Sequence, residues 1–351
     1  MPVILSHQLE KLMTPSKQDD AYTFDSEFEK ETILITGAAG SLGSELVKRI
    51  SRLKFFKLVL IDIAENALFQ LNKELRLDSN INIIVECLDI TKRGDLTELF
   101  KKYTPTLIFH TAAHKHVPEM ESKVYEAITL NIGSTVCLSE LAIKYKCRKF
   151  IFISTDKAVD PISVMGMTKA ISENYLMELN NNHNISFVSA RFGNILGSNG
   201  SALPIFLEQI KQNKPITITS TEATRYFISK KKAGNLILKI ATFNKSQGNL
   251  FTFEMGTPIK IVELASYIMK EHDYRKKVDI VGLRTGEKLH EKIVSKNEDV
   301  TATRFPEILK ITKKNSRVPK KKNLQDILNI PAGFNNDNLK IILKNYIEGL
   351  L

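Results

Sequence analysis

Four residues between positions 154 and 169 bring side chains that can move protons into one short segment, which also contains Met165. Ser154, Asp156 and Lys157 stand at the end of an apolar run, and Met165 and Lys169 lie in the segment that follows. Hydroxyl, carboxyl and amino groups can exchange protons, whereas the thioether of Met165 cannot at any physiological pH. The pattern predicts a buried strand ending at Ser154, then a loop, then a helix that carries Lys169 one turn after Met165. We predict an acid–base site here.

Two alternatives stay open for these residues. Asp156 and Lys157 could form only a local turn and ion pair, and Met165 could simply fill the core, as methionine often does.

The elements that must position this site alternate between strand and helix. SLGSELVKRISRL and ENALFQLNKELRL predict helices, and six apolar runs predict strands: ETILITG, KLVLIDI, INIIVECLDI, TLIFHTAA, KFIFIST and ISFVSARFGN. Strands alternating with helices of this length favour an α/β fold with a parallel sheet covered on both faces. We therefore predict a Rossmann-like, doubly wound sheet.

A glycine-rich turn, TGAAGSLGSEL, joins the first predicted strand to the first predicted helix. Gly37 permits the tight turn, Gly40 lets the backbone approach a pyrophosphate, and Gly43 lets the helix pack on the strand. The amino terminus of the helix offers free N–H groups to phosphates. A merely tight loop is the alternative. The placement between strand and helix favours a dinucleotide site, and we assign to it Gly37, Ala39, Gly40, Ser41, Leu42 and Gly43.

An acidic residue ends the second predicted strand. Asp62 follows the glycines by about 20 residues and is placed to accept hydrogen bonds from the adenosine ribose. A carboxylate there repels a 2′-phosphate and favours NAD over NADP, although Asp62 could be an ordinary strand-end acid. After the next two strands, further cofactor contacts are expected from Asp89, Ile90, Thr111, Ala112 and Ala113.

The rhythm of strand and helix changes at about residue 195, where shorter mixed segments begin. We predict an amino-terminal extension at 1–30, an NAD-binding domain at 31–194, and a smaller α/β subdomain, mainly for substrate, at 195–300. Residues 301–351 are expected to form a carboxy-terminal extension.

Composition excludes several classes of protein. The 351 residues are 43% hydrophobic and 25% charged, the usual globular mixture. No apolar run approaches the roughly 18 residues needed to span a bilayer. We expect no transmembrane segment and no signal peptide. Three scattered cysteines without a CxxC pair fit a reducing cytoplasm.

The net charge of +11 could indicate an anionic partner. No nucleic-acid recognition motif accompanies the charge, so we expect no nucleic-acid partner; a nucleotide diphosphate or an anionic membrane surface fits better. His110, His114 and His116 suggest a metal site, but no helix with a carboxylate and a histidine accompanies them. We expect no metal.

Seven segments in a fixed order resemble one enzyme family: TGAAGSLGSEL, TAAHKHVPEME, NIGST, STDKAVDPISVMGMTKAISE, ARFGNILGSNGS, TRYFIS and GLRTGEKLHE. Together they resemble nucleotide-sugar 4,6-dehydratases of the extended short-chain dehydrogenase/reductase type, which act on UDP-N-acetylglucosamine. The region before residue 31 resembles the linker in long, membrane-anchored relatives, and the chain resembles their short soluble form. That family carries either tyrosine or methionine at the position of Met165. The methionine type resembles enzymes that retain configuration at sugar carbon 5.

The resemblance implies an enzyme that oxidises carbon 4, removes water across carbons 5 and 6, and returns the hydride to carbon 6. It implies that Lys169 contacts the nicotinamide ribose and that Ser154 contacts the carbon-4 oxygen. Asp156 is the expected acid for the leaving hydroxyl. Lys157 is the expected base for carbon 5, provided that burial and Lys169 depress its pKa. The group that deprotonates the carbon-4 hydroxyl stays open between Asp156, Lys157 and a water.

The resemblance also implies a set of substrate contacts. They are Lys115, His116, Asn194, Arg225, Arg284 and Glu287, and Asn131 is expected to support a water chain beside the cofactor. The loop reads RTG where relatives usually have RPG. UDP is the commonest carrier, with GDP open, and the product would feed surface-glycan or nonulosonic acid synthesis in bacteria. A homo-oligomer, dimer or larger, is expected.

Two other functions fit parts of the sequence. A nucleotide-sugar epimerase on the same fold would normally need the proton donor that Met165 replaces. A protein that only senses NAD or a sugar nucleotide would explain Met165, but such a protein has no need of Asp156, Lys157 and Lys169.

Overall fold

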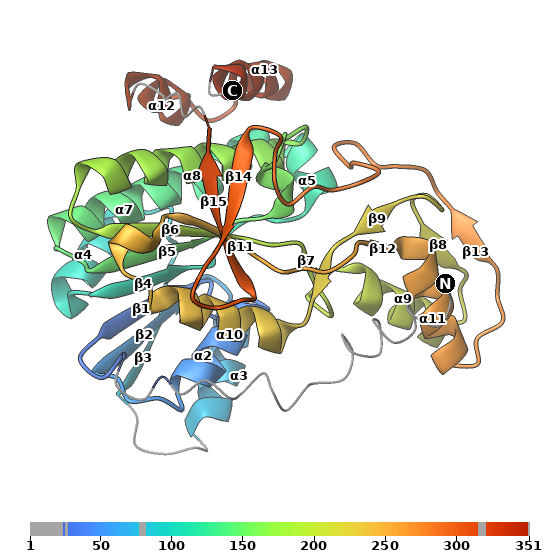
Figure 1. Ribbon diagram of the computed structural model, residues 1–351, viewed down its shortest axis with the longest axis horizontal. Coiled ribbons are helices and arrows are strands. Elements are labelled where there is room, and N and C mark those ends of the chain that lie inside the picture. The colour runs from blue at the N-terminus through green and yellow to red at the C-terminus, as the bar shows by residue number, and fades with distance from the viewer. Residues whose placement is uncertain (1–23, 25–26, 77–81, 315–320, 350–351) are drawn as a thin grey trace.

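The computed structural model describes residues 24, 27–76, 82–314 and 321–349. Most of the extension expected at 1–30, and most of the lysine-rich segment from residue 313 to 323, lie outside the described residues. Within these ranges nine strands form one sheet, in the order β14-β15-β11-β6-β5-β4-β1-β2-β3 (Figure 1).

The strands of this sheet agree with the predicted runs and add three more. They are β1 (Thr32–Thr36), β2 (Lys57–Asp62), β3 (Ile83–Cys87), β4 (Leu107–His110), β5 (Lys149–Ile153), β6 (Ser186–Arg191), β11 (Leu250–Phe253), β14 (Glu298–Ala302) and β15 (Ile308–Lys313). The first seven pair in parallel, while β15 pairs antiparallel with β11 and with β14.

Helices cover both faces of the sheet (Figure 1). They include α2 (Gly43–Ile50), α3 (Glu65–Arg76), α4 (Arg93–Tyr103), α5 (Val117–Ser122), α6 (Val124–Ala127), α7 (Ser134–Lys144), α8 (Val164–Asn182) and α10 (Lys230–Ala241). The short turns η2 (Ile128–Gly133), η3 (Asp156–Ala158) and η4 (Lys245–Gln247) complete this part.

Two hydrophobic cores lie on opposite faces of the sheet because side chains alternate along a strand. In β1, Leu34 packs into one core, while Ile33 and Ile35 pack into the other. The strands therefore need apolar residues on both faces, which explains their continuous apolar runs. The predicted α/β, doubly wound sheet is confirmed.

The sheet order reverses between the neighbouring strands β1 and β4. From β1 the chain continues on one side to β2, and from β4 it continues on the other side to β5. In open α/β sheets, the crevice at the carboxyl ends of the strands on either side of such a reversal binds ligands. The turns after β1, β4 and β5 all reach this edge, so it is where the candidate site must be sought.

A smaller part of the molecule lies beside this edge (Figure 1). It contains β7 (Asn194–Ile195), α9 (Ala202–Lys211), β8 (Ile216–Ile218), β9 (Thr224–Arg225), β10 (Phe227–Ile228), β12 (Ile259–Lys260), α11 (Ile261–Glu271) and β13 (Val278–Ile280). Its own buried cluster includes Phe206, Ile216, Ile259 and Leu264. The smaller α/β subdomain is therefore present.

The boundary predicted at residue 194 needs correction, because the chain returns to the main sheet after it. β11, β14 and β15 extend that sheet, and α10 packs against α2. The segments after residue 195 are too short and too polar to show from sequence alone which sheet they join. The part that contains the main sheet is thus discontinuous along the chain.

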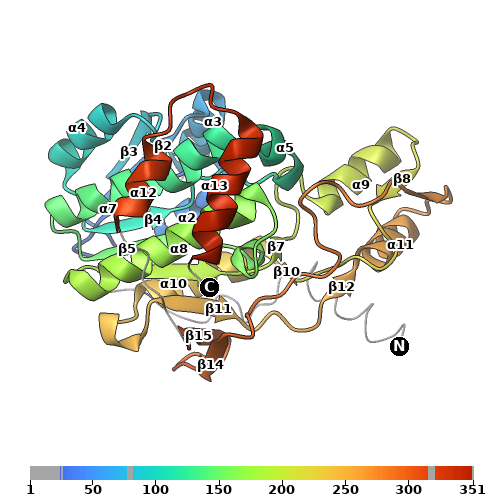
Figure 2. The same cartoon turned by 90° about the horizontal axis from the view of Figure 1, so that it is seen from above.

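The last two helices, α12 (Lys321–Leu328) and α13 (Asn336–Glu348), lie across the helix layer that contains α8 (Figure 2). Leu339, Leu343 and Ile347 of α13 are buried in the same core as residues of α8. Part of the outer surface of α8 is thus covered by the chain's own helix. In the described residues no helix has the length and apolar character needed to cross a membrane.

Candidate active site

The glycine-rich turn touches the loop after β4. Gly37 has a φ of +66°, and a Cβ there would lie 2.7 Å from the backbone of Ala112. Only glycine fits, since both the conformation and the close approach exclude a side chain. The Thr111 hydroxyl donates to the Thr36 carbonyl at 2.7 Å and fixes the two loops together.

Asp62 at the end of β2 is held in a defined orientation. Its carboxylate accepts hydrogen bonds from the N–H groups of Ala39 and Ala64, each at 3.0 Å. A bare backbone turn beside a fixed carboxylate fits the pyrophosphate and ribose of a dinucleotide. Asp89 accepts from the N–H and hydroxyl of Thr91 and shapes its own turn, and Ile90 is buried.

Asn131 links the loop after β4 to helix α8. It lies in η2, a π-helical turn, and its side chain bonds both the N–H and the carbonyl of His114. It also donates to the Thr168 hydroxyl at 3.0 Å. Asn131 is completely buried and fully engaged, so it positions the edge of the site.

The histidines of this loop have ordinary structural surroundings. His110 is buried between the hydroxyls of Thr36 and Thr135. Burial, with a smaller contribution from Lys169, lowers the pKa of His110 to about 3. His110 therefore stays neutral. Across the described parts of the chain, no group of three potential ligands is arranged to hold a metal.

Asp156 and Lys157 form the centre of the site. They occupy η3, directly after β5, and the Lys157 ammonium lies 2.9 Å from Asp156 Oδ1. Asp156 is fully buried, and its Oδ2 makes no hydrogen bond. The Lys157 ammonium also reaches Asn194 Oδ1 at 3.3 Å. A buried carboxylate with a free oxygen is suited to exchange a proton with a bound molecule.

The pKa of Lys157 differs from what we predicted. Burial alone would lower it, but the nearby charges of Asp156 and Glu291 raise the pKa above its ordinary value. Glu291 lies 3.5 Å from the Lys157 ammonium, so the lysine is held between two carboxylates. The expected depression of the Lys157 pKa is therefore absent, because these two carboxylates outweigh burial.

Lys169 has the lowered pKa instead. Its ammonium donates to the Ile153 carbonyl at 2.9 Å and lies 4.3 Å from the centre of the Phe152 ring. Burial lowers the pKa of Lys169 to about 7, against an opposing influence from Glu173. Lys169 therefore changes charge near neutral pH.

Ser154 points away from Asp156 and Lys157. Its hydroxyl donates to Glu173 Oε1 at 2.5 Å, so its proton is used by another side chain. The next residue, Thr155, donates to Asp156 Oδ1 at 2.8 Å and lies within the loop of residues 155–160, the reactive loop. Thr155 could not be identified from the sequence, because successive residues at a strand end point to opposite faces and the register decides which one enters the site.

Met165 lies buried in the first turn of α8, close to the reactive loop. At the next position, Gly166, an added Cβ would lie 2.3 Å from the Lys157 carbonyl oxygen. The helix and the loop therefore touch at the backbone. Ser163 caps the helix by accepting from the Gly166 N–H. These contacts explain why a glycine follows the methionine.

The predicted substrate residues other than Asn194 divide into three groups, and the first lies near the glycine-rich turn. Lys115 donates to the Asn199 carbonyl at 2.6 Å, and the Asn199 N–H donates to the Ser41 hydroxyl. Burial and Lys230 lower the pKa of Lys115. His116 packs against Gly200, the next residue of this loop. These residues form a bridge between the glycine-rich turn and the smaller subdomain.

The other two groups are a buried arginine and an exposed turn. Arg225 is buried and donates to the carbonyls of Thr224 and Leu289. Arg284 lies on an exposed turn that Glu287 stabilises by accepting from the Arg284 N–H. The structure thus brings Asn194 directly to Lys157, and it does not bring Arg284 and Glu287 into contact with Asp156 or Lys157.

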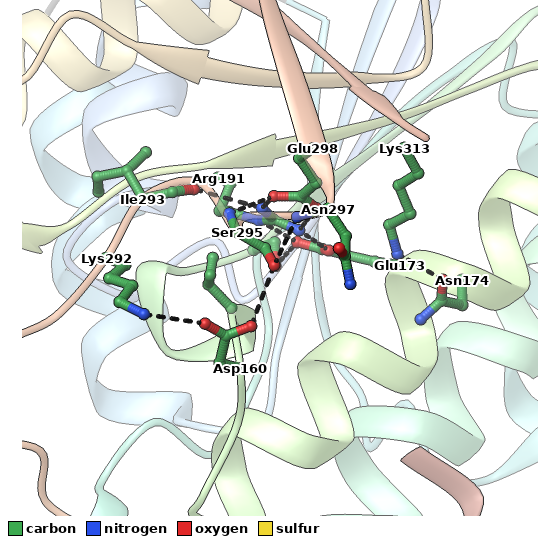
Figure 3. Close-up of polar contacts among 12 residues, drawn as sticks. Asp160, Glu173, Asn174, Arg191, Lys292, Ile293, Ser295, Asn297, Glu298 and Lys313 are labelled. Atoms are coloured by element: carbon green, nitrogen blue, oxygen red, sulfur yellow. Dashed lines mark hydrogen bonds and ion pairs between the residues drawn. The ribbon is translucent and has the colours of Figure 1, made fainter. Parts of the chain in front are cut away.

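Behind the site lies a buried ion network that the sequence did not reveal (Figure 3). Arg191, at the end of β6, pairs with Glu173 at 2.6 Å and with Glu298 at 2.9 Å. Glu173 is the acceptor for Ser154, so the network connects the end of β5 to α8 and to β14. The only available signal was the acidic residue one turn after Lys169, whose partner could not be identified from spacing.

A family model described as polysaccharide biosynthesis protein matches residues 33–313. The chain belongs to this family. The capsular polysaccharide biosynthesis protein CapD of Staphylococcus aureus is 39% identical over 80% of the chain, which spans 47% of that relative. The chain thus covers about half the length of this curated relative.

Two further proteins extend the family comparison. A UDP-glucose 4-epimerase of Rickettsia bellii is 32% identical over 77% of the chain and 80% of its own length. The X-ray structure of Pen from Bacillus thuringiensis has a TM-score of 0.74 and 27% identity, covering 80% of this chain and 89% of that one. Together with the fold, these similarities place the family member in the extended short-chain dehydrogenase/reductase superfamily.

Proposed function

We propose that the protein is an NAD-dependent hydro-lyase that converts nucleotide-linked N-acetylglucosamine, with UDP as the carrier, to the 4-keto-6-deoxy sugar with retention at carbon 5. The observation that carries this proposal is the ion pair of buried Asp156 with Lys157 at the carboxyl edge of the sheet, in a turn that packs against the helix containing Met165. Acid and base in direct contact suit an elimination, which needs one proton removed and one supplied.

The glycine-rich turn and Asp62 would hold NAD. When bound, this cofactor supplies both the acceptor for the hydride from carbon 4 and the donor that returns the hydride to carbon 6. Lys169 would contact the nicotinamide ribose. Thr155, whose hydroxyl lies beside Asp156, replaces Ser154 as our proposed contact to the carbon-4 oxygen.

Asp156 and Lys157 can exchange roles by moving one proton over 2.9 Å. Transfer from the lysine ammonium to the carboxylate gives a neutral amine, the base for carbon 5, and a carboxylic acid, the donor to the carbon-6 hydroxyl. Lys157 takes the carbon-5 proton and gives a proton back to carbon 5 when the hydride reaches carbon 6. The proton that the carbon-4 hydroxyl releases replaces the one that Asp156 gives to the departing water, so the net reaction loses only water.

The test is proton NMR of the purified protein with UDP-N-acetylglucosamine and NAD in deuterated water. We expect a new methyl signal, with deuterium at carbon 5 and a coupling pattern of retained configuration. A carbon-4 epimer without a methyl signal would favour the epimerase relatives. If UDP-N-acetylglucosamine stays unchanged, GDP-N-acetylglucosamine is the next substrate, and failure of both would contradict the proposal.

Met165 is expected to shape the site without exchanging protons. Met165→Leu should therefore lower the rate of methyl formation less than about tenfold, because thioether and alkyl groups of similar volume exchange at small cost. Met167→Leu, a buried neighbour in the same helix, is the matched control. Complete loss of product in Met165→Leu alone would show that the sulfur has a direct role.

A further inference from the structure

The segment from Lys288 to Glu298 runs from the smaller subdomain to the reactive loop. Several hydrogen bonds hold it against that loop. Lys288 donates to the Val159 carbonyl at 2.7 Å. The Asp160 carboxylate accepts hydrogen bonds from the Lys292 ammonium at 3.3 Å and from the Ser295 hydroxyl at 3.1 Å (Figure 3). These contacts all lie within four residues of Asp156, so the segment and the loop share one arrangement.

The far end of the segment is anchored in the buried ion network. Glu298 accepts from Arg191, which also donates to the Ile293 carbonyl at 3.3 Å (Figure 3). Because the segment is held on both sides of residue 291, the position of that side chain is fixed in advance of substrate binding.

Glu291 projects from this segment onto Lys157. Its side chain is only 2% exposed, and its Oε1 lies 3.5 Å from the lysine ammonium. Among the residues that the structure describes, its Oε2 makes no hydrogen bond and has Lys288, 3.8 Å away, as its ionic neighbour. A buried carboxylate with so few hydrogen bonds is costly, and its closest charged contact is the reactive lysine.

We propose that Glu291 is a positioning residue for Lys157: it holds the lysine ammonium beside Asp156 and sets the pH at which the lysine becomes a free base. The inference rests on the proposed function, in which Lys157 must lose its proton to act at carbon 5. The substrate subdomain would thereby control the base through one carboxylate.

The charges around Lys157 come from several elements. Asp156 adjoins it in η3, Arg225 acts from β9 to lower its pKa, and Glu291 acts from the segment after the exposed turn. Lys288 and Asp160 are further charged groups beside Glu291 and the loop. Removing the Glu291 charge leaves Asp156 as the one carboxylate in contact, so the lysine should lose its proton at a lower pH.

The first test is the pH dependence of kcat/KM for methyl formation. Asp156 and Lys157 must hold one proton between them, so activity falls at high pH as Lys157 loses its proton to solvent. In Glu291→Gln the midpoint of this fall should move down by about one pH unit, the usual influence of one nearby charge. Glu291→Asp should move it the same way by a smaller amount. Lys292→Met, which breaks only the exposed pair with Asp160, should leave the midpoint unchanged.

The second test needs no turnover. Amine labelling of Lys157 in the folded holoprotein, followed by mass spectrometry across pH, measures its protonation directly. The pH midpoint of labelling should shift down in the same way in each Glu291 variant that circular dichroism shows to be folded. An unshifted labelling midpoint would overturn the inference. Absence of methyl product from the wild type, with the labelling shift present, would instead overturn the proposed function alone.

Discussion

Replacement of Lys157 by alanine is expected to lower methyl formation roughly 10²–10⁴-fold, the usual contribution of a positioned acid or base. The Lys157 ammonium contacts Asp156, Asn194 and Glu291, none of which belongs to the glycine-rich turn. NAD affinity should therefore stay within about threefold of the wild type, since the phosphate-binding backbone is untouched. Rapid-mixing NMR and isothermal titration with NAD would measure the two quantities.

A second variant separates lost chemistry from disturbed charge. Lys157→Ala leaves Asp156 and Glu291 as two buried carboxylates without the cation that they share, so their negative charges repel each other. Adding Glu291→Gln removes that repulsion but restores no base, so turnover should stay low. Recovery of turnover in the double variant would show that Lys157 acts only as a counter-ion.

Asp156→Asn is expected to lower methyl formation by a factor similar to that of Lys157→Ala. The amide keeps the size of the side chain and can still accept from Thr155, but it cannot supply a proton to the carbon-6 hydroxyl. Near-normal product formation by both Asp156→Asn and Lys157→Ala would contradict the assignment of the pair.

Arg191→Met is expected to lower the free energy of unfolding by about 3–5 kcal/mol, the cost of leaving a buried ion partner unpaired. Both Glu173 and Glu298 lose their cation, and both are buried. Burial alone would raise the pKa of Glu173, but Arg191 lowers it in the folded protein. This contribution is therefore present above the unfolded-state pKa of about 4.3 and is lost as pH falls below it.

Urea denaturation at pH 7 and at pH 4 would measure this effect. Arg275→Met is the matched control, since Arg275 and Asp273 form an exposed pair that should contribute less than about 1 kcal/mol. A cost below about 1 kcal/mol for Arg191→Met at pH 7, equal to that of the exposed control, would contradict the role of the network.

The parts of the fold that sequence predicts are those specified locally. The strands β1 to β6 and the glycine-rich turn can be predicted because hydrophobic periodicity and backbone conformation depend on only a few neighbouring residues. The same holds for the pairing of Asp156 with Lys157, which are adjacent in the chain. Gly37 is the clearest case, since its left-handed conformation and its contact with Ala112 both require glycine.

The parts that sequence did not predict depend on contacts between distant segments. Glu291 stands in a polar stretch between lysines, and nothing in its surroundings shows that it is buried against Lys157. The side-chain direction at Ser154 and Thr155 depends on register with β6, whose Ala190 carbonyl accepts from the Ser154 N–H. A one-residue ambiguity at a strand end exchanges the two faces completely.

The late strands also bear on how the protein is made. On the ribosome, β6 emerges with one edge unpaired and with Arg191 lacking Glu298, until residues 250–253 and 298–313 have been synthesised. Unpaired strand edges invite association with other chains. A nascent chain that has released β6 from the ribosome before β11 is made would expose such an edge, and chaperone contact at that stage would protect it. The main sheet is therefore begun first and completed last.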